Sequence, residues 1–334
     1  MIKDILIDNS NLSFTVELTT PACPMKGLIE KDCKNAIHNM IDSGINVTVN
    51  FTSTVTSSRK AAEEMLSGVK NIVAIASGKG GVGKSTVSVN LAISLAKAGA
   101  KVGLIDADFY GPSIPIMFGL ENARPTVKER DGTQYIQPIE KYGIKLLSIG
   151  FLVPPEQAIV WRGPMVTSTF KQFLTHADWG ELDYLLFDLP PGTGDMQLSL
   201  AQLLPVTGAV VVTTPQAVAM ADVRKAIDMF HLEQINIPVI GLVENMAYFS
   251  PPDMPDKKYF IFGQGGADKL SEQYNIPLLG QIPIVEAIRT GGDIGEPVSL
   301  DEQNELSKYF VNCAQMTARE IAIRNAAKMS IEKV

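Results

Sequence analysis

A glycine-rich loop, GKGGVGKST at residues 78–86, lies between the apolar run NIVAIAS and the helical stretch KSTVSVNLAISLAKAG. It matches the pattern G-x-x-x-x-G-K-S/T in the order strand, loop and helix that a phosphate-binding loop requires. Glycines let successive backbone N–H groups point at phosphate oxygens, and the first turn of the following helix adds its positive end. The stretch therefore predicts a strand–loop–helix unit that binds nucleotide phosphates.

Two lysines lie in this loop, although a phosphate loop needs only one. Lys84 is expected to pair with the β- and γ-phosphates, and Ser85 to give its hydroxyl to Mg²⁺. The residues expected to surround the phosphates are Gly78, Lys79, Gly80, Gly81, Val82, Gly83, Lys84, Ser85 and Thr86. The early lysine, Lys79, needs a separate explanation.

Short β-branched runs alternate with helical stretches from Asn71 onward. The runs are NIVAIAS, KVGLID, YLLFD, AVVVTT, VIGLVEN and LLGQIP. Such alternation is typical of a mostly parallel sheet covered by helices on both faces. We therefore expect an α/β fold of the P-loop NTPase kind.

A smaller unit precedes this pattern. IKDILI and LSFTVEL flank the turn DNSN and predict a hairpin at residues 2–18, before a helix in PMKGLIEKDCKNAIHNMI and a third strand in INVTVNFTS. The segment TSSRKAAEEMLSGVK has no strand pattern. The expected organisation is a small α/β domain at 1–56, a linker at 57–70 and an ATPase domain at 71–334.

The composition of the chain limits which classes of partner we expect it to bind. The chain has 334 residues and a formal charge of −7, which argues against a broad basic face and hence against nucleic-acid binding. Its apolar runs are far shorter than the roughly 20 residues that span a bilayer, and no secretory pattern opens the chain. A cytoplasmic protein without membrane attachment is expected, with Cys23, Cys33 and Cys313 reduced.

Carboxylates follow two of the predicted strands. LIDADFYGPS carries Asp106 and Asp108, and YLLFDLPPGTGD carries Asp188. The carboxyl ends of parallel strands meet at one crevice, which is where the phosphate loop lies. Asp188 and Asp106 are expected to hold Mg²⁺ through its waters, and Asp108 to orient the attacking water. The alternative for Asp108 is to cap the next helix.

Asn245 ends the strand VIGLVEN at the same crevice. An amide accepts from adenine N6 and donates to N7, whereas guanine recognition usually needs a carboxylate, so Asn245 favours ATP over GTP. The neighbouring Glu244 is expected on the opposite face of the strand. The alternative is an asparagine that bonds its own turn.

Seven stretches together resemble the Mrp/ApbC group of deviant-Walker ATPases, relatives of MinD and ParA. They are GKGGVGKST, LIDADFYGPSIP, WRGPM, FDLPPGTGD, TTPQAVAMADVRKAI, GLVENMAYF and FGQGGADKL. The resemblance implies that Lys79 reaches the phosphates of the ATP held by a second subunit, so it implies a homodimer. It also implies a mobile-loop role for Arg162 near the dimer seam.

The family resemblance implies iron-sulfur cluster carriage, yet this chain departs from the pattern. Most family members carry a C-x-x-C after the equivalent of ENMAYF, and two such pairs hold a bridging 4Fe-4S cluster between subunits. Here SPPDMPDKKYFIFG places Pro251 and Met254 at the expected positions. Proline has no side-chain donor and a thioether is a poor ligand, which argues against the usual cluster site.

Cys23, in TTPACPMKG, is the remaining thiol of interest. It precedes a predicted helix whose amides would favour a thiolate able to contact iron or a client protein. The alternative is a small hydrophobe at a domain corner. Relatives usually carry a helix before the hairpin, so we expect the small domain to lack its first helix.

The expected function is a slow Mg²⁺-dependent ATPase that acts as a homodimer in iron-sulfur cluster assembly or transfer, with client or scaffold proteins as partners. One alternative is an ATP-switched adapter for client proteins without its own cluster. The other is a positioning ATPase of the ParA or MinD kind.

Overall fold

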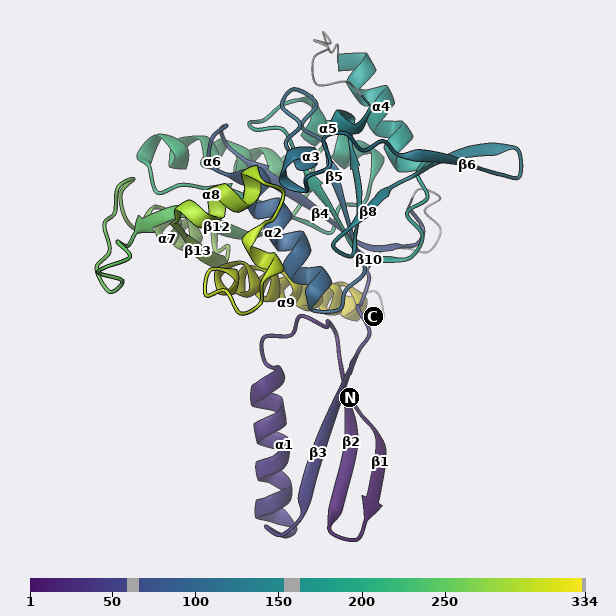
Figure 1. The fold of residues 1–334 in the computed structure, drawn as a ribbon, viewed down its shortest axis with the longest axis vertical. Coiled ribbons are helices and arrows are strands. Elements are labelled where there is room, and N and C mark those ends of the chain that lie inside the picture. Colours follow the sequence, from purple (N-terminus) through teal and green to yellow (C-terminus); the bar gives the residue numbers. More distant parts are fainter. Residues whose placement is uncertain (59–65, 153–162, 332–334) are drawn as a thin grey trace.

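The computed structural model describes residues 1–58, 66–152 and 163–331, and the elements given below are those of these residues. A small unit at the N-terminus stands apart from a larger body (Figure 1). Each unit has its own sheet, and the larger one carries the glycine-rich loop.

The small unit is a three-stranded sheet with one helix. β1 (Ile2–Asp8) and β2 (Asn11–Leu18) form an antiparallel hairpin, α1 (Lys26–Met40) follows, and β3 (Asn46–Ser53) pairs parallel with β2. The predicted hairpin, helix and third strand are thus confirmed. β1 is an edge strand, and its apolar residues Ile5, Leu6 and Ile7 are 60%, 68% and 78% exposed.

The large sheet has eight described strands in the order β13-β12-β11-β4-β10-β5-β9-β8. All neighbours are parallel except β8 and β9, which confirms the expected α/β class. The strands are β4 (Val69–Ser77), β5 (Val102–Asp106), β8 (Ile139–Lys141), β9 (Ile144–Ser148), β10 (Leu182–Asp188), β11 (Gly208–Thr213), β12 (Val239–Phe249) and β13 (Leu278–Ile284). β4, which leads into the glycine-rich loop, lies between β10 and β11 near the centre.

Helices cover both faces of this sheet. Side chains on alternate positions of each strand face opposite layers, so the runs are apolar throughout. One layer contains α4 (Gly163–Thr175), α5 (Asp195–Leu203), α6 (Ala217–His231) and α7 (Gly266–Tyr274). The other contains α2 (Lys84–Lys97), α3 (Ile114–Met117), α8 (Glu286–Asp293) and α9 (Ser307–Ile331). α9 buries Phe310, Cys313 and Ile321 in the core.

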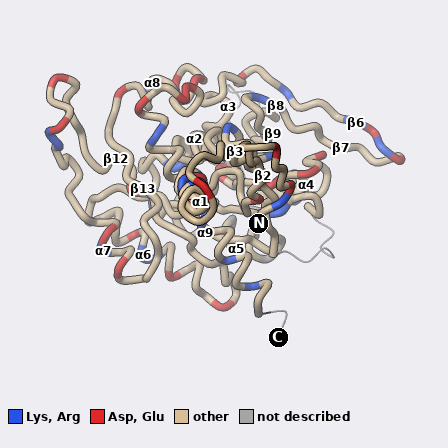
Figure 2. Tube along the Cα trace, turned by 90° about the horizontal axis from the view of Figure 1, so that it is seen from below, with Lys and Arg blue, Asp and Glu red and all other residues tan. Residues whose placement is uncertain are grey.

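Smaller elements complete the larger body. β6 (Thr126–Arg130) and β7 (Thr133–Gln137) form a hairpin that projects from it (Figure 1). Two short 3-10 helices, η1 (Ile149–Phe151) and η2 (Val298–Leu300), follow β9 and α8. Lysine and arginine are interspersed with aspartate and glutamate along the trace (Figure 2). Among the described helices, none has the length and apolar content that crossing a bilayer requires.

Among the described residues, hydrogen bonds from the small unit and from the segment after it join them to the larger body. The Thr20 hydroxyl, after β2, lies 3.1 Å from the Tyr184 hydroxyl on β10, and both side chains are buried. After β3, the carbonyl of Thr56 accepts from the amides of Asn71 on β4 and Asn325 on α9. The small unit is therefore attached near β10, β4 and α9.

Candidate nucleotide-binding site

The glycine-rich loop connects β4 to α2 as predicted, and its glycines have different tasks. Gly81 and Gly83 have φ of 80° and 78°, a region that favours residues without a Cβ. Gly83 is the N-cap of α2, so the positive end of that helix faces the loop. Gly78 instead lets the loop approach α6, because a Cβ there would meet the backbone of Asp222 and Val223.

Lys84 and Ser85, the first two residues of α2, converge on Asp188 at the end of β10. Lys84 Nζ lies 2.8 Å from Asp188 Oδ1, and Ser85 Oγ donates to Asp188 Oδ2 at 2.6 Å. Lys84 is 6% exposed and Asp188 is fully buried. The structure thus brings together these three residues of the predicted site, and Lys84 and Ser85 share one carboxylate.

Asp106 lies beside this pair at the end of β5, the neighbouring strand. Its carboxylate accepts from the N–H groups of Asp108 and Ile114, both at 3.2 Å, and from Ser148 Oγ at 2.9 Å. Asp106, rather than Asp108, therefore bonds the start of α3. Burial, followed by the charge of Asp188, raises the pKa of Asp106 to about 7.

Asp108 follows two residues later in the loop after β5 and is partly exposed. Burial raises the pKa of Asp108, while the charge of Lys84 opposes that rise. Both Lys84 and Asp188 act on its charge, so Asp108 lies near the same cluster. The role of Asp108 in orienting an attacking water stays a prediction.

The donor set suits a small hard cation. Asp106 and Asp188 are both fully buried, and Lys84 forms an ion pair with Asp188, so one lysine charge faces two carboxyl groups that a cation could bring into balance. Mg²⁺ is usually held by one or two carboxylates together with substrate phosphates and waters. Ser85 with these carboxylates fits that chemistry. In the described part of the chain, no three His, Cys, Asp or Glu side chains are grouped to hold a metal by themselves.

Lys79 reaches a partner within its own subunit. Its Nζ donates to Gln216 Oε1 at 3.0 Å, and its carbonyl accepts from Ser77 Oγ at 3.0 Å. Gln216 is the N-cap residue of α6. The predicted role of Lys79 in a second subunit stays a prediction.

Asn245 supports the loop directly. Its amide nitrogen donates to the carbonyl of Val82 at 2.9 Å, and the side chain is buried. Glu244 points the other way, where it accepts from the N–H of Ala267 at 3.0 Å and from Gln281 Nε2 at 2.7 Å. The expected alternation is confirmed, and Asn245 bonds the phosphate loop rather than its own turn. Adenine recognition by Asn245 stays a prediction.

The expected thiol and loop residues lie elsewhere. Cys23 is half-buried against the apolar cluster of the small unit, and neither it, Cys33 nor Cys313 forms a disulfide. Met254, at one expected thiol position, is 45% exposed. Arg162 lies outside the described residues.

Sequence reasoning missed three polar residues of the site. Ser88 donates to Asp188 Oδ1 at 2.6 Å, Ser148 bonds Asp106, and Gln216 bonds Lys79. Ser88 carried a usable signal, because a residue four positions after Lys84 lies on the same helix face. Ser148 ends β9 and Gln216 follows β11, so both come close to the site only through the fold.

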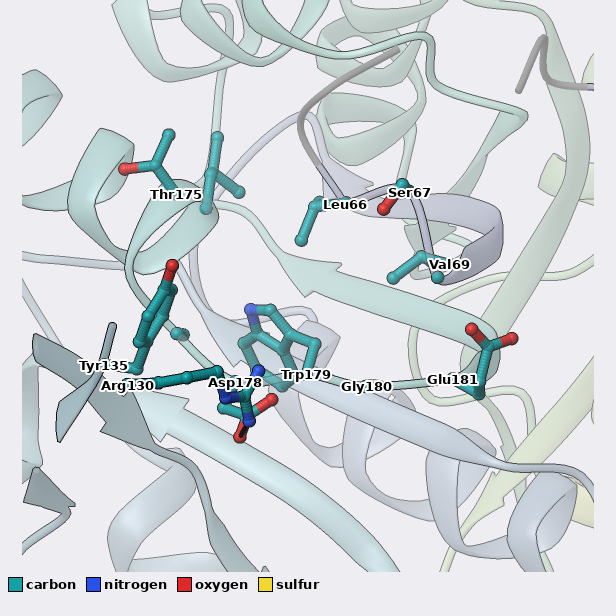
Figure 3. Close-up of a pocket in the computed structure, with 13 residues that line it drawn as sticks. Leu66, Ser67, Val69, Arg130, Tyr135, Thr175, Asp178, Trp179, Gly180 and Glu181 are labelled. Carbon is teal, nitrogen blue, oxygen red and sulfur yellow. Dashed lines mark hydrogen bonds and ion pairs between the residues drawn. The ribbon is translucent and has the colours of Figure 1, made fainter. Parts of the chain in front are cut away.

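A cavity of about 430 Å³ lies away from this site (Figure 3). It is lined by residues that precede β4 and β10, so it is at the opposite end of those strands from Asp188. Trp179 and Tyr135 form part of its wall, beside the 3.0 Å ion pair of Arg130 with Asp178. The cavity belongs to neither the phosphate loop nor the carboxylate cluster.

Comparisons with known proteins agree with this geometry. The chain is 47% identical to an iron-sulfur cluster carrier protein of Synechocystis sp., over 97% of this chain and 91% of that protein. It is 49% identical to an iron-sulfur cluster carrier protein of Deinococcus radiodurans, over 98% of this chain and 91% of that protein. The structure resembles a nucleotide-binding protein of Archaeoglobus fulgidus solved in complex with ADP, with a TM-score of 0.62 and 42% identity over 71% of this chain and 90% of that one.

Two family models divide the chain between them. Residues 1–51 match the model described as iron-sulfur cluster assembly protein. Residues 68–318, which contain the glycine-rich loop and every carboxylate of the cluster, match the model described as NUBPL iron-transfer P-loop NTPase. With most of its length covered by the second model, the chain belongs to the NUBPL iron-transfer family of P-loop NTPases.

Proposed function

We propose that this protein is a homodimeric Mg²⁺-dependent ATPase that transfers iron-sulfur clusters to apoproteins in the cytoplasm. The observation that carries the proposal is the convergence of Lys84 and Ser85 on the buried Asp188, at 2.8 and 2.6 Å. These are the groups that a P-loop ATPase uses for phosphate and metal binding. The names of the relatives support the cluster-transfer part.

The residues would divide the work on ATP as follows. Lys84 gives up its ion pair with Asp188 and binds the β- and γ-phosphates. The N–H groups of the loop surround the phosphate oxygens. Ser85, Asp188 and Asp106 are the residues that would hold Mg²⁺, which when bound would offset charge on the phosphates. Asp108 orients the attacking water, and Asn245 contacts the adenine. Turnover is slow in the absence of a partner.

The homodimer is proposed from the surroundings of Lys79. The hydrogen bond from Lys79 to Gln216 is partly exposed, and its acceptor is an uncharged amide. Lys79 therefore readily exchanges this bond for one to a phosphate. Tyr110, beyond Asp108, and Val218, beyond Gln216, are 69% and 68% exposed. Large apolar side chains at the rim of a polar site suit a face that a second copy covers.

Two lysine variants test this mechanism. Lys84→Ala should abolish nucleotide binding, because the phosphates lose their buried cation. Lys79→Ala should bind nucleotide within about threefold of wild type but hydrolyse ATP at least about 100-fold more slowly, as when a charge supplied across an interface is removed. Titration with a fluorescent ADP analogue and steady-state phosphate release measure the two effects.

Sedimentation with a non-hydrolysable ATP analogue and magnesium gives an independent readout. Wild type should form a dimer and Lys84→Ala should stay a monomer. Normal hydrolysis by Lys79→Ala, or a strictly monomeric wild type with saturating analogue, would contradict the cross-subunit mechanism.

The cluster is cargo in this proposal. Anaerobic reconstitution with iron and sulfide, followed by visible absorbance and iron and sulfide analysis, should show binding by wild type. Cys23→Ala beside it tests whether that thiol takes part. A wild type that binds neither iron nor sulfide would remove the carrier function.

Pro251 and Met254 favour a second candidate, an adapter that switches shape with ATP and docks client proteins without a cluster of its own. The reconstitution separates the two functions. An adapter should bind no iron yet keep ATP-dependent client binding in the Cys23→Ala variant.

A further inference from the structure

Asp188 accepts hydrogen from three side chains of α2 in the described structure. Lys84 Nζ and Ser88 Oγ approach Oδ1 at 2.8 and 2.6 Å, and Ser85 Oγ approaches Oδ2 at 2.6 Å. All three distances are short, as expected for bonds to an ionised carboxylate in a buried setting. Both oxygens of this carboxylate therefore have partners on α2.

Two of these partners are needed elsewhere when the site works. On the proposed function, Lys84 turns to the phosphates and Ser85 to Mg²⁺, and each then gives up its bond to Asp188. Ser88 lies one helical turn further into α2 and is fully buried. Its Oγ contacts Asp188 on β10, and the proposed function gives it no contact with the nucleotide, so it would keep this bond when the other two leave.

We propose that Ser88 is a positioning residue that holds the Asp188 carboxylate in place for magnesium while Lys84 and Ser85 engage the nucleotide. This inference rests on the proposed Mg²⁺-dependent nucleotide binding. Ser88 acts through Asp188 and touches neither metal nor phosphate. Partners of this kind orient the groups that hold a metal, and their removal typically lowers metal affinity about 10- to 100-fold.

A purely structural role for Ser88 is the competing explanation. Its Oγ also lies 3.1 Å from the carbonyl of Lys84, the bond that a serine inside a helix commonly makes to the residue four positions earlier. The hydroxyl has one proton to donate. The 2.6 Å contact to a carboxylate is both shorter and charge-assisted, so the proton lies toward Asp188.

Metal affinity separates these roles. In the full-length protein with a non-hydrolysable ATP analogue, Mn²⁺ is titrated by electron paramagnetic resonance as a probe of the magnesium site. Ser88→Ala should weaken Mn²⁺ binding about 10- to 100-fold. Its affinity for the analogue without metal should stay within about twofold of wild type, because Lys84 and the loop are intact. Ser88→Thr keeps the hydroxyl and should bind Mn²⁺ within about threefold of wild type.

Ser94→Ala is the matched control, since Ser94 is a buried serine of the same helix that contacts Ser299 at 3.4 Å. It should leave Mn²⁺ affinity unchanged. Equal Mn²⁺ affinities in Ser88→Ala and Ser94→Ala would overturn the inference, as would a Ser88→Thr variant as weak as Ser88→Ala. A wild type that binds the analogue equally with and without metal would instead overturn the proposed function.

Discussion

Asp106 illustrates how burial changes the pKa of a single carboxyl group. It is fully buried, it lies beside Asp188, and Lys84 is the cation that faces both. Desolvation disfavours the charged form, and the neighbouring negative charge adds to this, so the pKa rises from its ordinary value of 3.8 to about 7. Without metal or nucleotide, Asp106 therefore takes up a proton within the physiological pH range.

This proton uptake predicts a pH dependence of stability. Between pH 3.8 and about 7 the folded chain binds a proton at Asp106 that the unfolded chain releases, so this contribution to stability is lost as the pH rises through that window. Asp106→Asn, which cannot ionise, should lack the loss. Thermal unfolding in EDTA without nucleotide should therefore show the Tm of the variant gaining on wild type from about pH 5 to about pH 8. A constant difference in Tm would contradict the prediction.

At the scale of elements, local patterns carried most of the prediction. The strand, loop and helix around Gly83 were predictable because periodicity and glycine spacing are properties of neighbouring residues. The β6–β7 hairpin was missed, although Asp131 and Gly132 form its turn with φ of 53° and 73°. Asp-Gly is a strong hairpin signal, but the polar, exposed strands beside it lack the alternation that marks a half-buried strand.

Part of the candidate site could also be predicted from local sequence patterns. Lys84, Ser85 and Asp188 follow from motifs at strand ends, and the structure brings them together. The bond from Asn245 to Val82 and the bond from Ser148 to Asp106 depend on how distant segments approach, which no local pattern specifies. The domain limits 1–56 and 71–334 stay a prediction.

The loop before α2 allows a matched pair of glycine variants. A Cβ at Gly83 would be strained by its φ of 78° and would also meet the amide nitrogen of Asn245. Gly132 has a similar φ of 73°, but a Cβ there meets nothing within 4 Å. Gly132→Ala should lower the free energy of unfolding by about 1–2 kcal/mol and leave nucleotide affinity unchanged.

Gly83→Ala should destabilise the protein more than this, and it should also weaken nucleotide binding, because Asn245 must move from the loop. Urea unfolding and ADP-analogue titration compare the two variants. Equal losses of stability with intact nucleotide binding would show that the Asn245 contact has no role in shaping the loop.

At the scale of the molecule, a joint formed by the contact of Thr20 with Tyr184 links the small unit to the body that carries the candidate nucleotide-binding site. Thr20 and Tyr184 meet at the joint, and Asp188 lies four residues further along the same strand, β10. Four residues of strand span about 13 Å. The buried part of β10 from Tyr184 to Asp188 thus connects the small unit to the carboxylate that Lys84 and Ser85 share.

The joint gives a prediction for the whole fold. Tyr184→Phe removes one hydroxyl of a buried hydrogen bond and should lower the free energy of unfolding by about 1 kcal/mol. Tyr274→Phe is the control, because its hydroxyl bonds Asp228 at an exposed position. That change should alter stability by less than about 0.5 kcal/mol. Urea unfolding of both variants measures the difference, and equal effects would argue against a structural role for the joint.

The uncovered edge of β1 bears on any study of this protein in solution. A sheet edge with open N–H and C=O groups and adjacent isoleucine and leucine side chains pairs with other edges and adheres to surfaces. Some self-association through β1 is therefore expected at high concentration, regardless of which nucleotide is present. Charged substitutions at Ile5 and Ile7 should suppress this self-association and leave the proposed nucleotide-dependent dimer intact.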